Sequence, residues 1–289
     1  MADLTITDVF LRDGLQDEDV LVAMADKLLV ADQLAGAGVT RIEVTSFVNP
    51  KRVPQMGDAV ELVAALPRPE GVTHTVLALN GRGVERAVAA GATDINVVAS
   101  ASEAHSFENA GQGTAAALSG LAAAIKEFPG ITFNAAVSTA FACPFEGAIA
   151  HERLAWVVEA FLDMGIRVVG LADTLGTTPT PRVIALLRTV QRAHPGAELG
   201  LHLHNAEGQA LQTALEAADL GVRHFDAALA GFGGCPFAPG AAGNIATEQL
   251  VGAFRRAGHV TGIDERALAE AVLSAREAVA KGTPIGARG

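Results

Sequence analysis

Eight short β-rich runs alternate with Ala- and Leu-rich segments along the whole chain, and this alternation limits the fold more than any other feature. The runs predict strands at Ile6–Arg12, Arg41–Thr45, Thr73–Leu79, Asp94–Ala99, Thr132–Ser138, Arg167–Ala172, Leu199–His204 and His224–Leu229. Strands that alternate with helices pair in parallel, because each parallel strand needs a crossover connection. Eight such units within about 250 residues predict a single-domain α/β fold, the (β/α)8 TIM barrel.

Helices are expected between these strands and after the last one. They fall at Val20–Ala37, Asp58–Ala65, Gly83–Ala90, Thr114–Phe128, Ala150–Met164, Pro181–Ala193 and Gly208–Leu220, with extra C-terminal helices at Ile245–Arg256 and Glu265–Ala280. An open doubly wound sheet is the alternative, but no Gly-rich dinucleotide fingerprint follows the first strand. We therefore expect one catalytic domain over residues 1–281 and a loose C-terminal tail over residues 282–289.

Composition excludes several classes of protein. Half of the 289 residues are apolar and 18% are charged, which predicts a sizeable core rather than a disordered chain. The net charge of −11 argues against nucleic-acid binding, which needs surplus Lys and Arg. Two cysteines, Cys143 and Cys235, make no disulfide framework and favour a reducing compartment. With no signal peptide and no apolar run of about 18 residues, a cytoplasmic protein without membrane association is expected.

Reactive residue types follow the predicted strands at their carboxyl ends, where the active sites of TIM barrels lie. The set comprises Arg12, Asp13, Glu43, Asp173, His202, His204, Cys235 and Asn244. His202 and His204 are two apart on a strand, so both imidazoles point to the same face and could share one metal ion. A pair of histidines with ordinary hydrogen bonds is the alternative. Their position at a strand end, within reach of Asp13, favours the metal.

The charged residues admit structural as well as catalytic interpretations. Asp13 and Asp173 could each cap the helix that follows. Arg12 could be a surface charge, but at the barrel mouth it suits binding a thioester or carboxylate oxygen as negative charge develops there. Glu43 lies between Ile42 and Val44, and a carboxylate in such a strand needs a partner, for which Arg12 is the candidate.

The cysteines differ in context. Cys235 stands in a Gly- and Pro-rich loop, Gly231 to Gly240, whose backbone can come close to a ligand. Cys143, after the fifth predicted strand, is interpreted as structural or ligand-proximal. A reactive cysteine in the Gly-rich loop is therefore the stronger hypothesis.

Together these segments resemble the 3-hydroxy-3-methylglutaryl-CoA lyase family of metal-dependent TIM barrels, which is related to the isopropylmalate and homocitrate synthases. The segments that carry the resemblance are Arg12-Asp13-Gly14-Leu15-Gln16, Ile42 to Phe47 leading into Pro50 to Met56, Ala172-Asp173-Thr174, His202-Leu203-His204, Gly233 to Phe237 and Gly243 to Glu248. They follow the family's order over nearly the whole chain, and their combination is far more specific than any one motif.

The resemblance implies roles for individual residues. Asp13, His202, His204 and Asn244 match divalent-metal ligands, and this oxygen and nitrogen set suits Mg²⁺ or Mn²⁺, with other divalent metals compatible. Arg12 matches the arginine that stabilises the enolate oxygen, and Glu43 matches the glutamate that supports the site. Cys235 matches a cysteine that takes part in proton transfer. His202 and Asp173 are the candidates for the general base.

The resemblance also implies the reaction, cleavage of 3-hydroxy-3-methylglutaryl-CoA to acetyl-CoA and acetoacetate by retro-Claisen chemistry, in a homodimer or higher homo-oligomer. One departure concerns the substrate: Asn205 follows His204 where the best-known members have Asp, as in a bacterial side branch. The alternatives are a lyase for another branched 3-hydroxyacyl-CoA, such as citramalyl-CoA or a longer 3-hydroxy-3-carboxymethyl acyl-CoA, an acetyl-CoA-condensing synthase, and a non-catalytic acyl-CoA-binding barrel.

Overall fold

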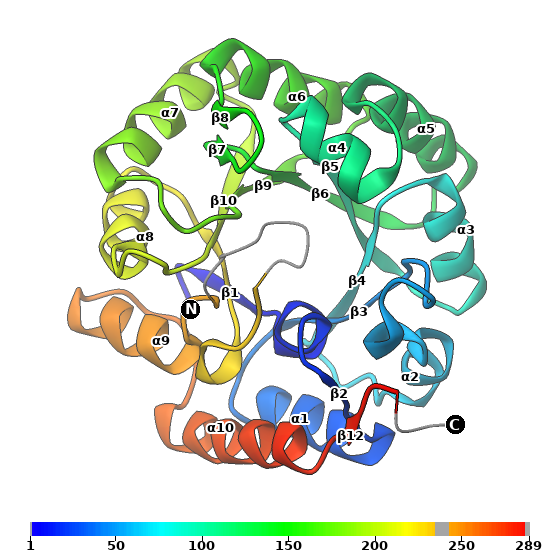
Figure 1. Cartoon of the computed structure of the whole chain (residues 1–289). Coiled ribbons are helices and arrows are strands. Elements are labelled where there is room, and N and C mark those ends of the chain that lie inside the picture. Colours follow the sequence, from blue (N-terminus) through cyan, green and yellow to red (C-terminus); the bar gives the residue numbers. More distant parts are fainter. Residues whose placement is uncertain (1, 235–242, 287–289) are drawn as a thin grey trace.

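The computed structural model describes residues 2–234 and 243–286 and shows a closed barrel of parallel strands surrounded by helices (Figure 1). The barrel strands are β1 (Thr5–Asp8), β3 (Arg41–Ser46), β4 (Thr73–Ala78), β5 (Asp94–Ser100), β6 (Thr132–Ser138), β9 (Val168–Asp173), β10 (Glu198–Leu203) and β11 (His224–Ala227). They are hydrogen-bonded in the order β1-β11-β10-β9-β6-β5-β4-β3, which closes back on β1. The predicted TIM barrel is thus confirmed.

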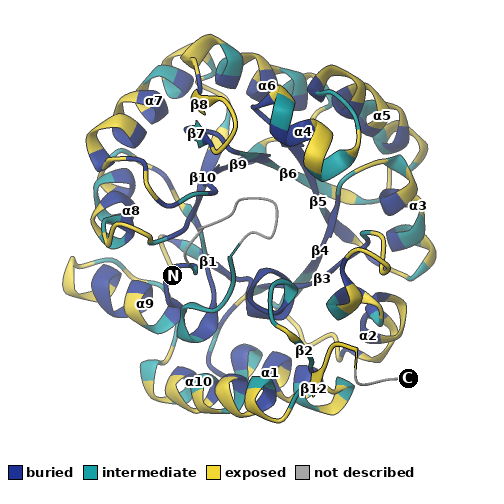
Figure 2. Ribbon diagram, viewed as in Figure 1, coloured by how far each residue is buried: buried dark blue, intermediate teal, exposed yellow. Residues whose placement is uncertain are grey.

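Helices cover the outside of the barrel. They are α1 (Met24–Gly36), α2 (Ala59–Ala65), α3 (Gly81–Ala89), α4 (Glu103–Ala110), α5 (Thr114–Glu127), α6 (His151–Asp163), α7 (Thr180–Ala193), α8 (Ala210–Asp219), α9 (Thr247–Arg256) and α10 (Glu265–Ala280). Their inward faces are buried and their outer faces exposed (Figure 2), as in α6, where Val157, Val158 and Phe161 are fully buried. Among the described residues, no helix is both long and apolar enough to cross a membrane.

Several predicted boundaries of helices and strands are wrong. The expected helix Val20–Ala37 is in fact a short strand, β2 (Val20–Leu21), followed by α1. β2 pairs with β12 (Thr283–Pro284), so this described part of the expected tail forms a two-stranded sheet with the segment before α1. The sequence pattern also missed α4, which is capped by the Ser102 hydroxyl accepting from the backbone N–H of His105. A hairpin of β7 (Ala142–Cys143) and β8 (Gly147–Ala148) was not predicted either.

The first strand ends earlier than predicted, because residues Phe10–Gly14 form a π-helical turn. The Val9 carbonyl accepts hydrogen bonds from the N–H groups of Arg12, Asp13 and Gly14, at 3.2, 2.7 and 3.1 Å. A Cβ on Gly14 would lie 2.9 Å from the Phe10 ring, so the turn requires glycine there. The turn, and not the strand, presents Arg12 and Asp13 to the barrel mouth; π-turns are frequent at functional sites.

Asp8 connects this turn to α9. Its fully buried carboxylate accepts the Phe10 N–H at 2.9 Å and the Thr247 hydroxyl at 2.6 Å. Burial raises the pKa of Asp8 from 3.8 to about 7, an increase that Glu248 reinforces and that the hydrogen bonds from Thr247, Phe10 and Leu229 only partly offset. The folded protein therefore binds a proton here at a pH where the unfolded chain has released it.

This increase in the pKa of Asp8 on folding predicts that the free energy of unfolding depends on pH. A carboxyl whose pKa rises on folding stabilises the folded state at low pH, and this contribution is lost as the pH rises from about 4 through about 7. In Asp8→Asn the amide oxygen still accepts from Phe10, and the group no longer titrates. From pH 5 to pH 8 we expect the wild type to lose on the order of 2 kcal/mol relative to the variant. Urea unfolding at both pH values measures this; parallel pH profiles would contradict it.

Candidate active site

The carboxyl ends of the strands surround a pocket of about 590 Å³ at the barrel mouth. Its inner wall includes Arg12, Asp13, His202 and His204, and its outer wall is formed by the loop after β3 and the start of α3. Four of the eight residues singled out by the sequence therefore line one cavity, although they come from opposite ends of the chain.

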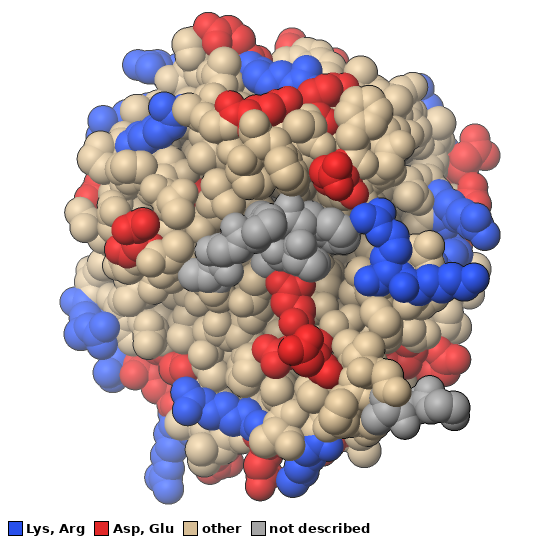
Figure 3. Space-filling model, in the orientation of Figure 1, with Lys and Arg blue, Asp and Glu red and all other residues tan. Residues whose placement is uncertain are grey.

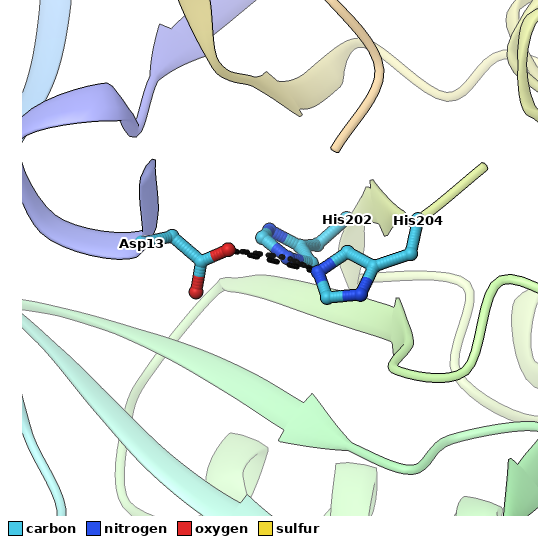
Figure 4. A group of neighbouring side chains, drawn as sticks. All are labelled: Asp13, His202 and His204. Carbon is cyan, nitrogen blue, oxygen red and sulfur yellow. Dashed lines mark hydrogen bonds and ion pairs between the residues drawn. The ribbon is translucent and has the colours of Figure 1, made fainter. Parts of the chain in front are cut away.

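Asp13, His202 and His204 form a compact cluster at the base of the pocket (Figure 4). Asp13 comes from the π-helical turn after β1, and the two histidines lie at the end of β10. The Asp13 Oδ2 atom is 3.8 Å from His202 Nε2 and 3.6 Å from His204 Nε2, and the two Nε2 atoms are 3.2 Å apart. All three side chains are buried.

Asn244 joins this cluster through a backbone bridge. It pairs antiparallel with His204, and the flanking hydrogen bonds run from Ile245 N–H to the Leu203 carbonyl and from Asn205 N–H to the Gly243 carbonyl. The Asn244 amide donates to Asp13 Oδ2 at 2.7 Å and to the Phe232 carbonyl at 2.9 Å. Its Oδ1 atom is buried and has no partner among the described residues.

Gly233 permits this close approach. It has φ +107°, and a Cβ at this position would lie 2.5 Å from Asn244 Nδ2 and 3.0 Å from Asp13 Oδ2. A side chain cannot occupy that space, so the chain passes directly over the carboxylate and the amide only because residue 233 is glycine.

The four side chains fit a divalent metal. Ligands about 2.1 Å from an ion lie roughly 3 to 3.5 Å apart, close to the separations between Asp13, His202 and His204. Asn244 Oδ1, which has no hydrogen bond to any described residue, is a further oxygen available to an ion. One carboxylate, two imidazoles and one amide oxygen form a set that suits first-row divalent ions and Mg²⁺.

Arg12 lies beside the cluster and is held by two carboxylates. Its Nε donates to Glu43 Oε1 at 2.7 Å, and its Nη1 donates to Asp13 Oδ1. Burial lowers the pKa of Arg12, but Asp13 and Glu43 outweigh that effect and raise it, so the guanidinium stays charged. The predicted Arg12–Glu43 partnership is therefore confirmed, and Asn96 supports Glu43 with a 3.3 Å hydrogen bond to Oε2.

The same interactions keep Asp13 ionised. Burial raises the pKa of Asp13, but Arg12 and the two histidines outweigh it and hold the pKa well below the usual range. For His202, burial lowers the pKa, whereas the hydrogen bond to Asp226 and the charge of Asp13 raise it further than burial lowers it. A negative oxygen thus faces two imidazoles, the arrangement that a cation would stabilise.

Asp173 lies at the end of β9 and is hydrogen-bonded to the loop that follows this strand. Its carboxylate accepts the Thr178 N–H at 3.0 Å and the Thr178 hydroxyl at 2.8 Å, which fixes the loop between β9 and α7. Burial raises the pKa of Asp173, and these hydrogen bonds only partly oppose it. Its neighbours Ala172 and Thr174 line the pocket, and the expected catalytic role of Asp173 stays a prediction.

Of the two cysteines, Cys143 lies among the described residues. Cys143 is buried, with its thiol 2.9 Å from the Ser102 hydroxyl, and it has a structural environment. Cys235 lies outside the described residues, so its expected role in proton transfer stays a prediction. Gly234, the residue before it, lines the pocket.

Sequence reasoning missed two polar residues that support the site. Asp226 on β11 lies 3.2 Å from His202 Nδ1, and Asn96 on β5 bonds Glu43. Each is an acid or amide inside an apolar strand, the same pattern that identified Glu43. The pattern therefore indicates these two residues as well.

Comparison with known proteins shows the family of the chain. The HMGL-like family model matches residues 3–273. The chain belongs to this family. It is 41% identical to the (R)-citramalyl-CoA lyase of Chloroflexus aurantiacus over 93% of this chain and 88% of that protein. It is 37% identical to the hydroxymethylglutaryl-CoA lyase YngG of Bacillus subtilis, over 86% of this chain and 84% of the relative.

A solved structure of an HMG-CoA lyase has the same fold as this chain. An HMG-CoA lyase from Acinetobacter baumannii, solved in complex with coenzyme A and 3-methylmalate, superimposes with a TM-score of 0.92 at 37% identity, covering 98% of this chain and 93% of that one. The relatives are lyases, and this HMGL-like protein is a carbon–carbon lyase. The family is metal-dependent, in keeping with the cluster of Asp13, His202 and His204.

Proposed function

We propose that this protein is a divalent-metal-dependent lyase that cleaves 3-hydroxy-3-methylglutaryl-CoA into acetyl-CoA and acetoacetate. The observation that carries the proposal is the meeting of a metal-ligand cluster, Asp13, His202 and His204, with a buried and permanently charged Arg12 in one pocket. Retro-Claisen cleavage needs both groups, because a hydroxyl loses its proton and negative charge then develops on the thioester oxygen. The hydroxymethylglutaryl-CoA lyases among its relatives support this substrate.

Each residue has a step in this proposal. Asp13, His202, His204 and Asn244 would hold Mg²⁺ or Mn²⁺, which when bound would lower the pKa of the C3 hydroxyl. After the proton leaves, the C3–O electrons form the ketone and the C2–C3 bond breaks. Its electron pair becomes the enolate of acetyl-CoA. Arg12 has Nε and Nη1 engaged by Glu43 and Asp13, which leaves Nη2 to donate to the enolate oxygen.

The two candidate bases differ in their access to substrate. His202 lines the pocket, whereas the carboxylate of Asp173 is engaged by Thr178. Of the two, only His202 lines the pocket, but its Nε2 would hold the ion and its Nδ1 faces Asp226, so neither candidate is a free proton acceptor and the hydroxyl proton would be released to solvent. Asp173 keeps an indirect role in ordering the loop that carries Thr174. Protonation of the enolate at C2 completes acetyl-CoA, and the resemblance assigns that step to Cys235.

The outer wall of the pocket suits the coenzyme A part of the substrate. Arg52, Arg82 and Arg86 line it, and Lys and Arg side chains gather on that side of the face, over α3 (Figure 3). In a chain with a net charge of −11, such a local group of guanidinium groups is a site for phosphates. Asn80 caps α3 at the same place by accepting the Gly83 N–H at 2.9 Å. A coenzyme A thioester is thus favoured over a free acid.

Citramalyl-CoA is the second candidate substrate. The 41% identity to a citramalyl-CoA lyase over 93% of the chain favours it. Both substrates have a tertiary hydroxyl β to the thioester, so the same residues serve either one. The departure at Asn205 does not distinguish them, because its Oδ1 accepts the Ala210 N–H at 3.1 Å and the residue does not line the pocket.

A substrate comparison tests the proposal. Metal-stripped protein is incubated with either thioester, with and without Mg²⁺ or Mn²⁺, and acetyl-CoA, acetoacetate and pyruvate are quantified. We expect metal-dependent release of acetoacetate and acetyl-CoA in equal amounts, with the higher kcat/KM on the methylglutaryl substrate. A higher kcat/KM with pyruvate as product would select the citramalyl substrate. Metal binding without cleavage of either thioester would contradict both assignments.

A further inference from the structure

Asp226 is a carboxylate behind the metal-ligand cluster that none of the proposed steps uses. It lies on β11 directly opposite His202 on β10, in register across the parallel pair. Its Oδ2 is 3.2 Å from His202 Nδ1. The other ring nitrogen of His202, Nε2, faces His204 Nε2 and Asp13 Oδ2. The two nitrogens of one imidazole thus meet two different groups.

This arrangement selects one tautomer of His202. A neutral imidazole carries a single N–H, and an ionised carboxylate only accepts hydrogen bonds. The proton is therefore at Nδ1, where Asp226 accepts it, and the lone pair is at Nε2, where it faces the cluster. A carboxylate in this position also fixes the rotation of the ring, as outer-sphere carboxylates do for metal-binding histidines in general.

No other described residue is hydrogen-bonded to the outer ring nitrogen of a histidine in the cluster. Asp13 is held by Arg12 and Asn244, and Asn244 by Asp13 and the Phe232 carbonyl. His204 Nδ1 is buried and has no partner among the described residues, so none of these holds the second histidine through its outer nitrogen. Removing Asp226 would leave both imidazoles free in tautomer.

Asp226 also occupies a particular place in the barrel. It lines the mouth pocket and a second cavity of about 320 Å³ inside the barrel, which is bordered by small and polar residues such as Thr75, Asn134 and Gly170. A quarter of its side chain is exposed there. The residue does not fill an apolar core, so packing alone does not account for it.

We propose that Asp226 is a positioning residue for the metal site: it holds His202 in the tautomer and orientation that present Nε2 to the ion. The inference rests on the metal site of the proposed function and does not depend on the identity of the substrate.

The test measures Mn²⁺ affinity of the metal-stripped protein by isothermal titration calorimetry. Asp226→Ala is expected to weaken Mn²⁺ binding about 10- to 100-fold. Asp226→Asn keeps the shape but presents both a donor and an acceptor to Nδ1, so a smaller loss is expected. Thr75→Val is the matched control, because Thr75 lines the same inner cavity, is buried and does not contact His202. The Mn²⁺ affinity of this variant should equal that of the wild type.

A second measurement reports the tautomer without metal. In ¹⁵N-histidine-labelled, metal-stripped wild type, recorded at a pH high enough for the ring to be neutral, His202 should show a protonated Nδ1 and an unprotonated Nε2, and this pattern should be lost in Asp226→Asn. Wild-type affinity in folded Asp226→Ala and Asp226→Asn would overturn the proposal, as would an equal loss in Thr75→Val. A wild type that binds no Mn²⁺ would overturn the metal site itself, which separates the two failures.

Discussion

Replacing His204 with alanine is expected to abolish metal binding and to lower kcat by about three orders of magnitude or more, because a metal that activates the reacting hydroxyl contributes several kcal/mol. His204 is buried, its Nε2 lies 3.6 Å from Asp13 Oδ2, and its backbone pairs with Asn244, so it joins two of the other ligands. Chelation of the wild type should reproduce the loss, and adding Mg²⁺ or Mn²⁺ back should reverse it in the wild type alone.

His74→Ala is the control for this experiment. His74 lies on β4 and, among the described residues, is not part of the pocket wall. Metal content measured by elemental analysis and kcat should both match the wild type in this variant. A His204→Ala protein that retains metal and turns over at the wild-type rate would remove His204 from the site.

Replacing Arg12 is expected to give the second large effect. A single donor to a developing oxyanion contributes about 3 kcal/mol, so Arg12→Met should lower kcat 100- to 1,000-fold with little change in KM. Arg12→Lys should recover only part of this, because an ammonium cannot contact Glu43, Asp13 and the substrate with the planar geometry of a guanidinium. Steady-state kinetics on the preferred thioester measures both.

Stability must be separated from catalysis at this position. Arg12→Met leaves the carboxylates of Glu43 and Asp13 buried without their cation, and breaking such a buried pair costs about 3–5 kcal/mol. Adding Glu43→Gln removes one of the two stranded charges. We expect the double variant to regain part of the lost stability in urea unfolding while kcat stays low. If kcat recovers together with stability, Arg12 acts through the fold and not on the enolate.

The sequence alone predicted the architecture and most of the site. Strand and helix periodicities gave the order of the barrel, because each element's apolar pattern is local and is preserved when the elements pack. Spacing along one strand placed His202 and His204 on the same face, and an acid inside an apolar strand identified Glu43 as a residue that needed Arg12. Whether Asp13 was a cap or a ligand stayed open, because both uses require the same residue type after a strand.

Only the tertiary structure decided which side chains meet. Asp13 and Asn244 are 231 residues apart, and their contact exists because barrel closure sets β1 beside β11. Asp8, which accepts the Phe10 N–H in the π-helical turn that presents Arg12, is also bonded to Thr247 from α9, a partner that local sequence does not reveal. His202 contacts Asp226 for the same reason, because side chains on different elements can bond only after packing has fixed the distance between them. The residue types were therefore determined by the sequence, and their roles by the contacts that closing the barrel creates.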